Sequence, residues 1–217
     1  MNENARITGI FAGIVILLLT LAFIILVSVF PSGEYQTMDQ FISGYTRALL
    51  FPVIPSFLLV LANIPFFISL FYYAEEPARP FALAGLLFGV AYTLCSGINY
   101  FVQLTVVPQN IHSGHLSAVS LLSMHIKGSF AFALDNLGYA FLSVSFLFFS
   151  GIFALKGLQG YTKSAFIVYG ITGLMGTAGY MSGNAFLESF VLISAFPYLV
   201  AVVLVLALYL RKSGRTE

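Results

Sequence analysis

Long runs of apolar residues alternate with short polar segments along the whole chain. A helix that crosses a bilayer needs about 20 mostly apolar residues. Six runs reach that length, at residues 7–30, 49–73, 81–107, 129–155, 165–186 and 190–210. Backbone groups in hydrocarbon must pair within their own segment, so runs this continuous predict helices. We therefore predict an all-α, polytopic membrane protein in which residues 1–217 form one six-helix transmembrane bundle.

Composition strengthens this prediction. Apolar residues make up 59% of the chain and charged residues only 8%, whereas a soluble domain carries about 25% charged residues. A chain so poor in charge could not cover a water-exposed surface, and a single Cys excludes a disulfide scaffold. The net charge of +1 gives no electrostatic reason to expect a nucleic-acid partner. The expected partner is the lipid bilayer, and the expected location is the plasma or inner membrane of the cell.

The basic residues predict how the bundle is oriented. Lys and Arg concentrate on the cytoplasmic side of short membrane loops. With the N-terminus inside, only Arg47 and Lys127 lie outside, and seven basic residues lie on the cytoplasmic side: Arg6, Arg79, Lys156, Lys163, Arg211, Lys212 and Arg215. Both termini are therefore predicted to be cytoplasmic, and the longer polar loops to lie on the outer face.

One acidic residue, Asp135, falls inside a predicted span. An ionisable group within the membrane suggests a functional site. Asn99 and Gln103 lie four residues apart on one face of the preceding span, at a similar depth, and Tyr139 follows Asp135 by one helical turn. These four residues are the predicted ligand-binding site. Alternatively, they bond to one another and hold the two spans together.

Three histidines offer a second candidate chemistry. His112 and His115 lie three residues apart, and His125 follows in the same predicted loop. This spacing suits a metal if the loop is folded, but the loop is rich in Ser and Gly, and a metal site needs rigid support around its ligands. We predict exposed loop histidines, and neither a metal nor a cofactor.

Two sets of glycines predict close helix contacts. Gly9 and Gly13 form a small-xxx-small pair in the first span, a candidate docking face for a helix of another protein. The fifth span carries Gly176, Gly179 and Gly183. For these three, packing within the bundle and a homodimer face are the two alternatives.

Two segments resemble a known group of proteins. Residues 99–107 read Asn-Tyr-Phe-Val-Gln-Leu-Thr-Val-Val, and Asp135 precedes Leu-Gly-Tyr at 137–139. In both respects the chain is similar to a group of uncharacterised bacterial six-helix integral membrane proteins, over roughly residues 45–210. The resemblance implies the six-helix fold and marks Asn99, Gln103, Asp135 and Tyr139, but it implies no activity. Asp135 stands where the group has Glu, and the Trp expected just before it is missing.

Three functions fit these observations. In the first, a small solute is bound or transported through an outward-facing polar pocket near Asp135. In the second, the protein is an enzyme that acts on lipid head groups at the outer leaflet, with Asp135 as general acid or base. In the third, it is a scaffold or regulatory membrane protein, and Asp135 belongs to a structural polar core. The sequence leaves the question of an enzyme open.

Overall fold

The protein is a bundle of long helices. The computed structural model describes residues 1–31, 35 and 37–213, and within them the only β-contact is an isolated bridge between Tyr35 and Ile126. The helices, in chain order, are α1 Glu3–Val29, α2 Met38–Gly44, α3 Val53–Tyr73, α4 Arg79–His112, α5 Leu116–Leu122, α6 Phe130–Ser150, α7 Gly157–Ser182, α8 Ala185–Glu188 and α9 Phe190–Ser213. Two 3-10 turns, η1 (Arg47–Leu50) and η2 (Glu76–Ala78), precede α3 and α4. The all-α prediction is confirmed for the described residues.

Five helical stretches in the described residues are long and apolar enough to cross a membrane. They are Glu3–Val29, Arg47–Tyr73, Glu76–His112, Phe130–Ser150 and Ala185–Arg211. The architecture is therefore that of a multi-pass helical membrane protein, and its many exposed apolar side chains suit contact with lipid. Residues 165–182 of the predicted span at 165–186 fall in α7, which is 26 residues long but is not among these five, and the span's last residues reach α8.

Several helices begin or end at residues other than the predicted span boundaries. Helix α4 runs past residue 107 and through Pro108 to His112, and α5 occupies part of the predicted loop. Helix α7 begins at Gly157, eight residues before its predicted span, whereas α6 ends at Ser150, five residues early. Hydropathy reports which residues suit a membrane, but hydrogen bonding and caps decide where a helix begins and ends.

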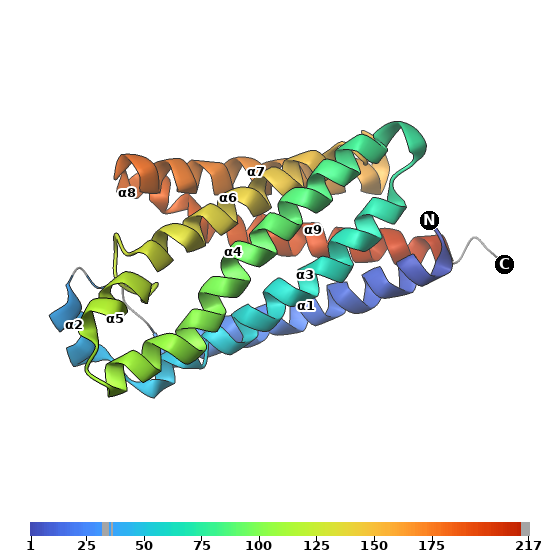
Figure 1. Cartoon of the computed structure of the whole chain (residues 1–217). Coiled ribbons are helices and arrows are strands. Elements are labelled where there is room, and N and C mark those ends of the chain that lie inside the picture. The colour runs from blue at the N-terminus through green and yellow to red at the C-terminus, as the bar shows by residue number, and fades with distance from the viewer. Residues whose placement is uncertain (32–34, 36, 214–217) are drawn as a thin grey trace.

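A cluster of stacked, buried aromatic rings lies in the half of the bundle where α1 begins and α9 ends. The start of α1 and the end of α9 lie at the same end of the bundle, whereas α2, α5 and α8 lie at the opposite end (Figure 1). Near the termini, Phe67 stacks on Phe149 with ring centroids 5.8 Å apart, and Phe146 stacks on Phe166 at 4.6 Å. These four rings are fully buried. They form an aromatic layer that closes this half of the bundle.

Gly9 and Gly13 pack inside the bundle, which corrects the prediction that they dock a partner helix. A Cβ on Gly9 would collide with the side chains of Tyr209 and Ser69, and a Cβ on Gly13 would lie 2.7 Å from Leu206. The small residues thus let α1 approach α3 and α9 of its own chain. This face of α1 is covered by α3 and α9 of the same chain.

The glycines of α7 also serve packing within the chain. A Cβ on Gly176 would meet Val191, and one on Gly179 would meet the backbone of Leu187 and Glu188. Gly183 ends α7 in the left-handed conformation, with φ 69°, which few other residues adopt. Of the two alternatives for this face, the structure shows packing within the bundle.

The termini share their end of the bundle with several of the basic residues. Arg6 lies in the first turns of α1, Arg79 begins α4, Lys156 caps α7 and Arg211 lies near the end of α9. Arg47 and Lys127 belong to the segments at the opposite end, before α3 and before α6. Arg215, which the prediction counted among the cytoplasmic residues, lies outside the described residues.

Candidate functional site

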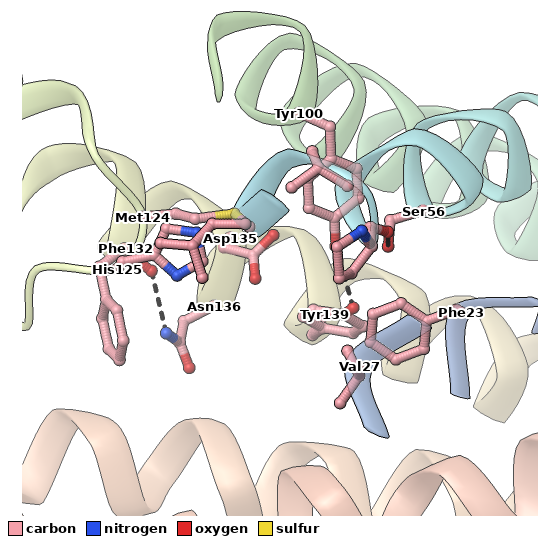
Figure 2. A pocket seen from close by; sticks show the side chains of 13 residues that line it. Phe23, Val27, Ser56, Tyr100, Met124, His125, Phe132, Asp135, Asn136 and Tyr139 are labelled. Carbon is pink, nitrogen blue, oxygen red and sulfur yellow. Dashed lines mark hydrogen bonds between the residues drawn. The ribbon is translucent and has the colours of Figure 1, made fainter. Parts of the chain in front are cut away.

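A cavity of about 280 Å³ lies in the half of the bundle away from the termini. Helices α1, α3, α4 and α6 and the segment between α5 and α6 form its walls (Figure 2). Its polar lining consists of Ser56, Tyr100, His125, Asp135, Asn136 and Tyr139. Two of the four residues predicted from the sequence, Asp135 and Tyr139, therefore line one cavity.

Asp135 lies in the second turn of α6 and is half-buried. The Asn99 side-chain amide donates a hydrogen bond to its Oδ1 at 3.3 Å. The predicted contact between these two helices is thus present. Among the described residues, no Lys, Arg or His forms an ion pair with this carboxyl group. Burial of a carboxylate costs free energy unless the group is paired with a cation or hydrogen-bonded. In the described part of the chain, only neutral groups contact this carboxylate.

Gln103 uses its amide to hold the segment that precedes α6. Its Nε2 donates to the Leu122 carbonyl at 2.8 Å and to the Asn99 side-chain oxygen at 3.1 Å. Its Oε1 accepts from the Met124 backbone N–H at 3.0 Å. Gln103 and Asn99 are buried behind Asp135 and are not part of the cavity lining. Their geometry suits the positioning of Asp135 and Met124 more than direct contact with a ligand.

A pair of tyrosines forms the inner wall of the cavity. The hydroxyl groups of Tyr100 and Tyr139 are 3.0 Å apart, and either one can donate (Figure 2). Tyr100 was not predicted as a site residue, although it follows Asn99 directly and lies four residues after Ser96 on α4. The four-residue spacing from Ser96 places Tyr100 near the same helix face, and this was the signal in the sequence that could have identified it. Asn136 was not predicted either, because neighbouring residues on a helix point in different directions. It nevertheless lines the cavity together with Asp135.

The histidines do not gather into one site. His112 and His115 are exposed at the end of α4, whereas His125 lines the cavity and stacks on Phe41, with ring centroids 6.1 Å apart. In the described part of the chain, no group of three or more His, Cys, Asp or Glu residues is arranged to hold a metal ion. His125 is instead a wall residue between the cavity and α2.

His125 gives the fold a pH dependence of known sign. Burial lowers the pKa of His125 to about 4, from an ordinary value near 6.5. Between those two pH values, His125 binds more protons in the unfolded chain than in the folded chain. The free energy of unfolding is therefore highest above pH 6.5, as far as His125 is concerned, and it falls as the pH drops toward 4. We expect the melting temperature of the wild type to fall more between pH 7 and pH 4.5 than that of His125→Gln. Equal falls in the two proteins would contradict this role.

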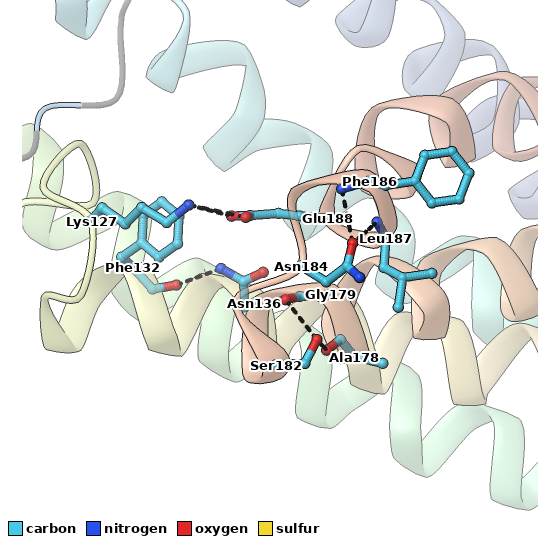
Figure 3. A network of polar contacts seen from close by, with 10 residues as sticks. All are labelled: Lys127, Phe132, Asn136, Ala178, Gly179, Ser182, Asn184, Phe186, Leu187 and Glu188. Carbon is cyan, nitrogen blue, oxygen red and sulfur yellow. Dashed lines mark hydrogen bonds and ion pairs between the residues drawn. The ribbon is translucent and has the colours of Figure 1, made fainter.

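An ion pair closes the same end of the bundle. Lys127, in the segment before α6, contacts both carboxylate oxygens of Glu188 in α8, at 3.0 and 3.2 Å (Figure 3). Asn184 starts α8 by accepting hydrogen bonds from the N–H groups of Phe186 and Leu187. The pair therefore links the segment beside the cavity to the connection between α7 and α9.

We expect removal of this ion pair to destabilise the protein measurably. The side chains of Lys127 and Glu188 are 35% and 18% exposed, so solvent screens the pair less than a surface pair. Lys127→Met should lower the free energy of unfolding by about 1 kcal/mol. The matched control is Arg79→Met, which removes the more exposed ion pair of Arg79 with Glu76. This substitution should change the free energy of unfolding by less than about 0.5 kcal/mol. Equal effects of the two variants would contradict a special role for Lys127.

The fold and the cavity together define a class: a helical, multi-pass membrane protein with a polar cavity in one half of its bundle. The chain matches no protein-family profile, no curated protein and no solved structure. The geometry of the cavity is thus the basis for assigning a function.

Proposed function

We propose that this protein binds a small solute in the cavity at Asp135, as the first step of transport across the membrane. The observation that carries the proposal is a carboxyl group that lines a cavity while only neutral groups of the described chain contact it. Membrane proteins place ionisable residues facing a cavity where they serve substrate or ion pathways. A polar solute would supply the contacts that the chain itself leaves out.

We also propose six membrane crossings, with α7 as the fifth. The start of α1 and the end of α9 lie at one end of the bundle, which supports an even number of crossings. Helix α7 is about 39 Å long at 1.5 Å per residue, enough to span the hydrocarbon core. Its low hydropathy has a physical reason, because its glycines pack on neighbouring helices: Gly170 faces Leu147 and Gly173 faces Ser143. A helix covered in this way needs fewer large apolar residues.

The proposed orientation places the cavity on the outer side of a plasma or inner membrane. It is supported by the basic residues at the ends of α1, α4, α7 and α9, which share the end of the bundle that contains the termini. The aromatic layer then separates the cavity from the cytoplasm. Membership in the bacterial six-helix group that the chain resembles remains part of this proposal, and contact between Asn99 and Asp135 supports a shared role for its two motifs.

A structural polar core is the second candidate function. It is favoured by the hydrogen bonds of Gln103, which all remain within the chain. In that case the carboxyl group of Asp135 serves only to join α4 to α6. The two functions differ in one measurable respect, since only a binding protein gains stability from a solute.

The test is a thermal-shift screen of the purified protein against small metabolites. We expect at least one solute to raise the melting temperature of the wild type, and Asp135→Asn to abolish this rise. The matched control is Asp39→Asn, which makes the same chemical change at an exposed position on α2 and should keep the rise. A screen without any stabilising solute, or a rise that survives in Asp135→Asn, would overturn the proposal.

A further inference from the structure

The cavity combines a carboxyl group with aromatic rings, which is the chemistry that recognises an ammonium ion. Phe23, Tyr100, Phe132 and Tyr139 surround the space next to Asp135 (Figure 2). The face of an aromatic ring attracts a cation, and aromatic cages bind amines in this way. An ammonium group would also supply the positive charge that no described residue brings to Asp135.

The cavity is slightly smaller than a typical site for a drug-sized ligand. Its volume of about 280 Å³ lies just below the range of about 300–1,000 Å³ that is typical of sites for whole drug-sized ligands. A ligand that is longer than the cavity must therefore extend beyond it. The direction in which it can extend is set by the helices that border the cavity.

Part of the cavity wall consists of apolar residues of α1 that are not fully buried in the bundle. Helices α1 and α9 pack closely near the termini, where Gly9 meets Tyr209, and they separate toward the other end (Figure 1). The buried residues of α1 end at Ile16, and beyond this point Phe23 and Val27 line the cavity. The first turns of α9 also expose large apolar side chains, with Leu192 82% and Phe196 74% exposed.

We infer that the ligand is a single-chain amphiphile with an ammonium head group, which enters from the bilayer beside Phe23 and Val27 of α1. The ammonium lies against Asp135, among the aromatic rings, and the aliphatic chain runs out past Val27 into the lipid. This inference rests on the proposed solute site and specifies its ligand class. It also gives the apolar outer half of α1 a role in the site.

The experiment compares three probes on the protein in dodecyl maltoside: decylamine, propylamine and decanol. Decylamine has both the charge and the chain, whereas propylamine lacks the long chain and decanol lacks the charge. Thermal shifts at a series of concentrations give a Kd for each probe. We expect decylamine to bind at least tenfold more tightly than propylamine, since burial of each additional CH₂ is favourable, and decanol to give no shift.

Two substitutions on α1 test the path of the chain. Val27→Trp fills the opening beside the cavity, and we expect it to raise the Kd of decylamine at least tenfold while the Kd of propylamine changes less than twofold. Val29→Trp makes the same change at a position that is 61% exposed and outside the cavity lining, and it should alter neither Kd. Asp135→Asn should abolish the shifts from both amines.

The other possible results show whether the amphiphile, the charge or the solute site itself is wrong. Propylamine binding as tightly as decylamine, or a Val27→Trp variant that binds decylamine normally, overturns the amphiphile and leaves an amine site at Asp135. Equal shifts from decanol and decylamine overturn the role of the charge. If none of the probes shifts the melting temperature, the inference is wrong, and the metabolite screen with Asp135→Asn decides the solute site independently.

Discussion

Gln103→Leu is expected to lower the free energy of unfolding by about 3 kcal/mol. The substitution removes the hydrogen bonds that Gln103 makes to Leu122 and Met124 and leaves a backbone carbonyl and a backbone N–H without their partner. A buried polar group left unsatisfied costs about 1–3 kcal/mol, and Gln103 itself is buried. Both backbone groups are half-buried, so water offsets part of the loss. Unfolding in mixed micelles, followed by circular dichroism, measures the change.

The matched control for Gln103→Leu lies two residues further along α4. Thr105 donates its hydroxyl to the Phe101 carbonyl at 2.7 Å, within its own helix and on an exposed face. Thr105→Val keeps the shape and removes this bond, and we expect it to change the free energy of unfolding by less than about 0.5 kcal/mol. If the two substitutions had the same effect, Gln103 would not be the residue that anchors the segment before α6.

This role of Gln103 could not be predicted from the sequence, although its contact with Asn99 could. The predicted match in depth between Asp135 and Asn99 depends on helix rise, on the predicted span boundaries and on the topology that the basic residues indicate. The partners of Gln103 are backbone groups at Leu122 and Met124. Every residue carries such groups, so no residue type marks them in a sequence.

The walls of the cavity show a second limit of sequence reasoning. Phe23 and Val27 have the same apolar character as their lipid-facing neighbours on α1, yet they line the cavity. A membrane helix is apolar on every side, so its pattern does not reveal which face meets lipid and which meets a cavity. The glycines are more informative, since small residues in a span predict close packing, but they do not name the helix that packs against them.

A Cβ on Gly179 is expected to destabilise the protein by about 3 kcal/mol. In Gly179→Ala the added methyl group would collide with the backbone of Leu187 and Glu188. A backbone cannot rotate away as a side chain does, so the turn between α7 and α9 must open, and overpacking of this kind costs about 1–3 kcal/mol or more. Gly97→Ala is the matched control, because Gly97 is a buried helical glycine whose Cβ would lie 3.8 Å from Val60, an ordinary contact.

The same collision predicts a coupling to the ion pair at the end of the bundle. Gly179 packs against the backbone of Glu188, and Glu188 pairs with Lys127. If Gly179→Ala displaces Glu188, the pair is already weakened, so Lys127→Met should cost less in the Gly179→Ala background than in the wild type. In the Gly97→Ala background it should cost the full amount. Additive effects of Gly179→Ala and Lys127→Met would show that the turn absorbs the methyl group without moving Glu188.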